Sequence, residues 1–238
     1  MSPVWTLDFV VQHTILIQVK DKQLTLPFRH RGGRRKGAGR PPNGKTAMVS
    51  HLERPKFEKV TPAHVTLRIA NDIPSLRSSR RFALIRSCFA KAKQKDKLRL
   101  VEFTVLSNHL HLIVEADSST KLSRGVQGLC VRLARALNGA LKRSGRVFAD
   151  HFHSRLLRSP TALVHAIRYV LDNARQHYGG SGVDFFSSES PEAAELLSSR
   201  ESWLLRAGWM RAPRRLLARL LELPRYRRRL SAWRAWLD

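Results

Sequence analysis

The chain has 238 residues, of which 42% are apolar, and this is enough material for one domain with a buried core and extensions. Its 44 lysines and arginines against 18 aspartates and glutamates give a formal net charge of +26. We expect a polyanion as partner, either a nucleic acid that the protein merely coats or one that it acts on. The charge therefore indicates the class of partner but not the chemistry.

The two cysteines, Cys88 and Cys130, are far apart and form no CxxC motif, so we expect reduced core residues of a cytoplasmic protein. Near the start, residues 9–19 are apolar but are interrupted by polar side chains. They also lack a basic leader and a small-residue cleavage site. We expect neither a signal peptide nor a membrane span.

The amino-terminal part, residues 1–53, is expected to be an extension of the main domain. Residues 1–27 give no functional signal, whereas residues 28–46 are rich in glycine, proline and basic side chains and cannot build a core. The Gly-Arg-Pro sequence at 39–41 resembles an AT-hook, which lies in the DNA minor groove; a plain basic linker is the alternative. The candidate DNA-binding residues here are Arg34, Arg35, Lys36 and Arg40.

The main domain is expected over residues 54–180, followed by a linker and a basic, Trp- and Arg-rich helical region over 181–238. The hydrophobic periodicities predict strands over 64–69, 98–106, 109–115 and 154–158, and helices over 76–95, 122–141 and 160–178. Ser107-Asn108 suits a hairpin turn, and Pro160 suits the first turn of a helix. This order predicts an α+β ferredoxin-like sandwich, an antiparallel sheet with two helices packed on one face.

Two histidines mark one of these strands. Because alternate side chains of a strand share a face, His109 and His111 point the same way, together with Ile113 and Glu115. Two imidazoles on a rigid support, with apolar residues on the other face, favour a metal site.

The last predicted helix carries a tyrosine on its polar side. At about 100° per residue, Tyr169 lies with His165, Asp172, Asn173 and Gln176, whereas Tyr178 falls on the apolar side and is expected in the core. Asn173 is one turn beyond Tyr169, so its amide oxygen could complete a metal site with the two histidines. An amphipathic surface tyrosine beside a solvated asparagine is the alternative.

Taken together, these residues resemble the single-tyrosine transposases of the HUH-endonuclease superfamily, in particular the REP-associated branch. The stretch 107–114 is similar to the family's Asn-His-φ-His-φ metal strand, where φ is apolar, and 168–175 is similar to its catalytic helix. Residues 148–155 and 64–69 also match, so the resemblance spans about 54–178, with a weaker echo at 203–209. His151 replaces a commonly basic residue, and the leader before residue 28 has no counterpart.

The resemblance implies Tyr169 as nucleophile, a 5′-phosphotyrosine intermediate, and Mg²⁺ or Mn²⁺ held by His109, His111 and Asn173. The expected partner is single-stranded DNA that folds as a hairpin, with no nucleotide cofactor; the protein would be a bacterial, nucleoid-associated monomer or homodimer. Its expected DNA contacts within the matching motifs are His153, Arg155, Arg168 and Arg175.

Three alternatives stay open at this point. The second His-x-His, His151 and His153, could be the metal pair, although a structural or DNA-contact role suits His153 better. The protein could be an inactive DNA-binding descendant of such an enzyme. It could also be a metal-dependent phosphoesterase, although an enzyme for small phosphoesters would not need a charge of +26. The tail's Trp203, Trp209, Trp233 and Trp236 could stack on bases, but packing is the commoner role of tryptophan.

Overall fold

A computed structural model describes residues 55–95, 98–179, 182–223 and 225–226. The candidate DNA-binding residues Arg34, Arg35, Lys36 and Arg40 lie outside this part of the chain, as do Trp233 and Trp236. In the described residues both cysteines are free thiols, and no helix is long and apolar enough to span a membrane.

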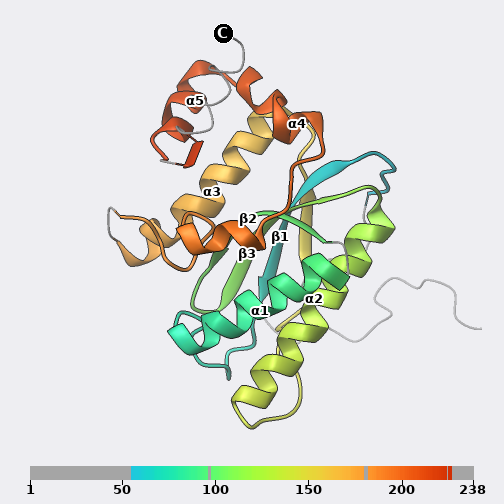
Figure 1. Cartoon of the computed structure of the whole chain (residues 1–238), viewed down its shortest axis with the longest axis vertical. Helices are drawn as coiled ribbons and strands as arrows, with labels where there is room; N and C mark the ends of the chain where they lie inside the picture. The colour runs from blue at the N-terminus through green and yellow to red at the C-terminus, as the bar shows by residue number, and fades with distance from the viewer. Residues whose placement is uncertain (1–54, 96–97, 180–181, 224, 227–238) are drawn as a thin grey trace, which may run out of the picture. The chain divides into compact units, whose positions relative to one another are not determined.

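The main domain follows the predicted order of strands and helices. The elements are β1 (Thr61–Arg68), α1 (Ser79–Lys95), β2 (Arg99–Val105), β3 (His109–Ala116), α2 (Ser119–Ala140), β4 (His153–Leu156) and α3 (Pro160–Tyr178). The four strands form one antiparallel sheet in the order β2-β3-β1-β4 (Figure 1). This is the ferredoxin-like arrangement, which confirms the predicted fold.

Helices α1 and α2 pack side by side on one face of the sheet, as predicted (Figure 1). Their apolar stripes recur every three or four residues and meet the apolar positions of the strands, which recur every second residue. The strand residues of this core include Val65, Leu67, Phe103, Val105, Leu110, Leu112 and Val114; the helix residues include Phe82, Ile85, Phe89, Val126, Leu129 and Leu133.

Helix α3 covers the opposite face of the sheet, where a second apolar core forms. Val101 of β2 and Ile113 of β3 pack there against Ile167, Val170 and Leu171 of the helix. The far side of α3 packs against the carboxyl-terminal elements α4 (Trp203–Arg206), η2 (Gly208–Arg211) and α5 (Arg214–Leu221), whereas η1 (Pro191–Leu196) packs against α1. The helix is thus held between the sheet and residues far beyond it in sequence.

The ends of α3 are fixed by local sequence. The Ser159 hydroxyl accepts a hydrogen bond from the Ala162 amide, and Pro160 occupies the first turn, where its missing N–H costs nothing. Gly179, which follows the last helical residue, has a φ of 71°, a backbone conformation that favours glycine, and the helix ends there. These signals set the start and the stop of the helix that carries Tyr169.

The two edges of the sheet differ. The outer edge of β2 is covered by residues 186–198, through hydrogen bonds that include Val105 N to Phe186 O (2.9 Å) and Ser188 N to Phe103 O (2.9 Å). Strand β4 pairs with β1 on its inner side, and no strand of the described chain pairs with its outer side. The β4 edge is therefore open.

Candidate active site

A row of polar side chains crosses the sheet on the face toward α3. His111 of β3 lies opposite Thr104 of β2 and opposite Thr66 of β1, and Thr66 in turn lies opposite His153 of β4. Residues in register share a face, so one line across four strands presents two imidazoles and two hydroxyls to the helix. The next line carries His64.

His111 is buried, and its two ring nitrogens have different surroundings. Nδ1 lies 3.1 Å from His64 Nε2 and 3.1 Å from Thr66 Oγ1, both within hydrogen-bonding distance. Nε2 is buried and has no hydrogen-bond partner among the described residues. A buried polar atom without a partner is costly, so this nitrogen is free for a ligand that the described part of the chain does not supply.

His109 lies beside His111, with 4.8 Å between the ring centroids and the rings nearly perpendicular. Its Nδ1 is 2.7 Å from Asn108 Oδ1. An amide oxygen only accepts hydrogen bonds, so Nδ1 carries the proton and the lone pair lies on Nε2. Two strand neighbours and one turn residue thereby orient both histidines.

Burial keeps these imidazoles neutral. Burial, followed by the charges of His153 and Arg155, lowers the pKa of His64 to about 4. Burial and the neighbouring histidines lower the pKa of His111 to about 3, and the pKa of His109 is lowered for the same main reason. At neutral pH the three rings therefore keep the lone pairs that metal binding or proton acceptance requires.

Tyr169 lies over this cluster. Its ring centroid is 5.0 Å from that of His111 and 5.7 Å from that of His64, and the side chain is 48% exposed. The phenol thus combines contact with the histidines and access from solvent. Tyr226, by contrast, is fully buried and donates its hydroxyl to Glu102, 2.9 Å away.

The prediction that Tyr178 lies in the core was wrong. Its side chain is also 48% exposed. Tyr178 is the last residue of α3, and there the helix extends past the edge of the core. Its hydroxyl accepts a hydrogen bond from the Ser107 amide (2.8 Å), and the Arg77 guanidinium stacks on its ring at 4.5 Å. Tyr178 therefore ties the end of α3 to the turn before His109, and exposure alone does not single out Tyr169.

Asn173 is buried, with 2% of its surface exposed, so the alternative of a merely solvated amide is wrong. Its Oδ1 atom is buried and has no hydrogen-bond partner within the described ranges, as is also true of Nε2 of His111. In the described part of the chain no three His, Cys, Asp or Glu side chains form a possible metal site. A metal bound by the two histidines would therefore need a ligand of another kind, and an amide oxygen is one that Mg²⁺ and Mn²⁺ accept.

A cleft of about 670 Å³ opens between α3 and strands β1 and β4. His111 and Tyr169 line it, as do His153 and Arg155, two of the residues predicted to contact DNA. Its lining also includes His64, Thr66, Thr161 and His165.

No role was predicted for His64 and Thr66 from the sequence. They lie two residues apart on the first predicted strand, so their side chains share a face. The pairing of β1 with β3, which brings them to His111, could not be read from the sequence.

Two further candidates have partners within the protein. Arg168 pairs with Asp172 (3.3 Å), and Arg175 pairs with Asp172 (2.9 Å) and with the buried Glu189 (2.5 Å). Their side chains are about one quarter exposed. Arg175 therefore holds the end of α3 against the following segment, a structural role that was not predicted from the sequence.

The two histidines of the second His-x-His, His151 and His153, line different hollows. His153 lines the cleft, whereas His151 lies before β4 and lines a separate hollow with Phe148 and Phe152. The two do not present a common site.

Known proteins similar to this chain include transposases. Residues 63–164 match the family model of IS200-like transposases, a segment that contains both histidines and ends five residues before Tyr169. No curated protein matches the chain.

Two solved structures are similar. One is a REP-associated tyrosine transposase bound to a REP hairpin, with 17% identity, a TM-score of 0.47 and coverage of 59% of this chain and 82% of that one. The other is a proposed transposase from Deinococcus radiodurans R1, with 12% identity, a TM-score of 0.37 and coverage of 53% and 95%. Residues 63–164 of this chain, the part that contains the histidine strand, are therefore similar to the IS200-like transposases, in agreement with the family expected from the sequence.

Proposed function

We propose that the protein is a metal-dependent transposase that cleaves and rejoins single-stranded DNA with Tyr169 as its nucleophile. The observation that carries the proposal is the placement of an accessible phenol against His111, whose Nε2 is buried and unpaired in the same cleft. A nucleophile and a vacant ligand atom on facing elements are what phosphodiester cleavage requires.

His109, His111 and Asn173 would hold Mg²⁺ or Mn²⁺. The fit rests on the two buried atoms without partners, His111 Nε2 and Asn173 Oδ1, and on the Asn108 contact that leaves His109 Nε2 with its lone pair. Neutral imidazoles and an amide oxygen together suit a cation of this kind. When bound, the ion supplies positive charge for a nonbridging phosphate oxygen and so lowers the repulsion of the attacking phenol.

The protein's own part in the reaction falls to Tyr169. Its Oη attacks phosphorus, the Tyr–O–P bond forms as the P–O3′ bond breaks, and the 3′ oxygen leaves and takes up a proton while the phenol loses one. The bond energy stays in the phosphotyrosine, so a 3′-hydroxyl can reverse the step and join strands without a nucleotide cofactor. Helix α3 positions the phenol because both its ends are capped and its two sides are packed.

DNA would enter along the open side of the cleft. His153 and Arg155 line it there, and no ion pair of Arg155 is formed with a described residue, so its charge is available for a phosphate. Strands that fold as hairpins are the substrate that the sequence resemblance implies. The formal charge of +26 adds a long-range attraction that salt weakens.

We further propose that the site is complete within one chain. Tyr169 meets His111 of its own sheet, and Tyr178 binds the Ser107 amide two residues before His109. A mixture of Tyr169→Phe and His111→Ala proteins should then stay inactive. Recovery of activity in the mixture would instead mean that two chains exchange α3 and act as a dimer.

The central experiment is adduct formation. A hairpin-containing single strand incubated with Mn²⁺ should give a covalent protein–DNA adduct that denaturing electrophoresis separates from free protein. Tyr169→Phe should reduce the adduct to below detection, whereas Tyr178→Phe, an equally exposed tyrosine on the same helix, should retain it. An adduct formed by Tyr169→Phe would overturn the assignment.

The same assay distinguishes the alternatives. An inactive DNA-binding descendant would bind the strand in a salt-dependent way and form no adduct with either metal. A small-molecule phosphoesterase would hydrolyse a nitrophenyl phosphate without steep salt dependence and would gain nothing from the DNA strand.

A further inference from the structure

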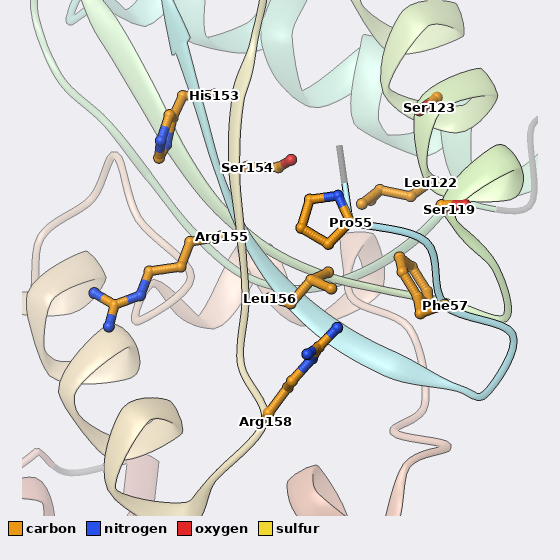
Figure 2. Close-up of a pocket in the computed structure, with 10 residues that line it drawn as sticks. All are labelled: Pro55, Phe57, Ser119, Leu122, Ser123, His153, Ser154, Arg155, Leu156 and Arg158. Carbon is orange, nitrogen blue, oxygen red and sulfur yellow. The ribbon is translucent and has the colours of Figure 1, made fainter. Parts of the chain in front are cut away.

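A second hollow lies across β4 from the catalytic cleft (Figure 2). It has a volume of about 380 Å³ and lies between β4, the start of α2 and the segment before β1. Ser154, Leu156 and Arg158 project into it from β4 and the residues after it, whereas His153 and Arg155 project to the other side of the strand (Figure 2). The alternation of a strand thus supplies the lining of both hollows.

The lining combines flat apolar walls with hydroxyl groups. The apolar side chains of the lining are those of Pro55, Phe57, Leu122 and Leu156 (Figure 2). The hydroxyl-bearing residues of the hollow are Ser119, Ser123 and Ser154. The volume falls within the roughly 300–1,000 Å³ range of small-ligand pockets, and the composition suits a flat ring with polar edges.

Positive charge borders this apolar space. Arg158 lines the hollow and is exposed, and none of the described residues forms an ion pair with it. Arg155 belongs to the lining of both hollows, as does His153. A ligand that is flat and aromatic at one end and negatively charged at the other would satisfy both parts, which is the chemistry of a nucleotide.

The open edge of the sheet connects the hollow with the cleft. No described strand pairs with the outer side of β4, so no further β-strand of the described chain lies at the sheet edge that the hollow and the cleft share. A single DNA strand that passes over the edge would keep its phosphates near Arg155 and Arg158 while one base turned inward.

We propose that this hollow binds one unpaired nucleotide of the DNA strand whose neighbouring phosphate occupies the catalytic cleft. The base lies against Phe57, with its polar edge toward the serine hydroxyls, and Arg158 contacts its phosphate. The proposal rests on the proposed function for the identity of the strand, but it concerns binding and needs neither the nucleophile nor the metal.

The test compares two strands of equal length and charge, oligothymidine and its abasic counterpart, in EDTA. The ratio of their affinities for the full-length protein isolates base stacking from phosphate attraction. Phe57→Ala should lower this ratio by about 5- to 100-fold, the range that stacking of a base on an aromatic ring provides. Phe185→Ala, which removes an exposed ring elsewhere, should leave the ratio unchanged.

A second variant guards against misfolding of the first, because Phe57 also packs against the core. Ser123→Phe fills the hollow from the surface of α2 and should lower the ratio as well, and Arg158→Gln should weaken both strands equally and reduce the salt dependence of binding. An unchanged ratio in Ser123→Phe would overturn the proposal. If the wild-type protein forms no adduct but the affinity ratio responds to these variants as expected, the proposed chemistry is wrong and the proposed nucleotide site is supported.

Discussion

The two faces of the sheet differ in chemistry although helices cover both of them. Toward α1 and α2 the strands present valines, leucines and phenylalanines, all buried. Toward α3 the same strands present Glu102, Thr104, His111 and Glu115, which are also buried. Burial of a polar group lowers the stability of the fold unless the group forms hydrogen bonds, so each buried polar group on this face should have a partner or a ligand.

At one end of this polar face the carboxyl-terminal segments provide the partners. Glu102 accepts hydrogen bonds from Ser188, Arg200 and Tyr226, at 2.6, 2.6 and 2.9 Å. Glu115 accepts from the amides of Glu201 and Ser202, both at 2.8 Å, at the start of α4. These carboxylates anchor residues 188–226 to the sheet.

At the other end His111 keeps one nitrogen without a partner. The comparison teaches that the polar groups of this face serve two purposes, attachment of the tail at one end and a reactive site at the other.

The largest expected effect comes from neighbouring positions on opposite faces of β3. His111→Ala should abolish the DNA adduct in folded protein, because it removes Nε2, a ligand atom that no described residue hydrogen-bonds. Leu112→Ala should instead lower the free energy of unfolding by about 2–5 kcal/mol and leave the adduct intact in the folded fraction. Adduct yield and urea denaturation together measure both. An active His111→Ala protein would remove the site from this face.

Loss of a tail anchor should come next. Glu102→Ala leaves the Arg200 guanidinium, whose side chain is 7% exposed, without its carboxylate, and should cost about 3–5 kcal/mol. Glu195→Ala breaks the exposed pair with Arg86 and should cost about 0–1 kcal/mol. Urea denaturation at neutral pH gives both values, and equal values would contradict the anchoring role.

Support of the histidine site should produce a smaller effect. His64→Ala removes a hydrogen-bond partner of His111 Nδ1, and Thr66→Val removes the other. We expect the Mn²⁺ concentration for half-maximal adduct formation to rise by about 10- to 100-fold in His64→Ala, and less in Thr66→Val. The maximal rate should be recovered at high Mn²⁺. A lower maximum without a shift in the metal requirement would place His64 in the chemistry itself.

The smallest effect is on stability as the pH falls. Unfolded histidine takes up a proton near pH 6.5, but burial lowers the pKa of His64 to about 4 and that of His111 to about 3. The unfolded chain therefore binds more protons between these values, and stability should fall as the pH is lowered from about 6.5 toward 4. Urea midpoints measured in EDTA should show this slope. It should be shallower in His64→Gln, and an unchanged slope would mean that His64 is protonated without penalty in the folded protein.

Much of this fold could be predicted because local signals agreed with each other. Alternation on β1 and β3 and the helical spacing of α1 and α2 each give a buried face without knowledge of the partner element. Ser159, Pro160 and Gly179 set the bounds of α3 in the same local way. The position of Tyr178 could not be predicted, because helical periodicity gives the side of a helix but not how far the neighbouring core extends along it.

By itself the sequence determined the shared face of His109 and His111, the helix that carries Tyr169, and the charge that favours a polyanion. Only the tertiary structure brought His64 and Thr66 to His111, buried Asn173, and engaged Arg175 with Glu189. The physical reason is that the periodicity of a strand or helix relates only side chains that are close in sequence, within about one turn or one pleat. Which faces then meet depends on strand order and on segments distant in sequence.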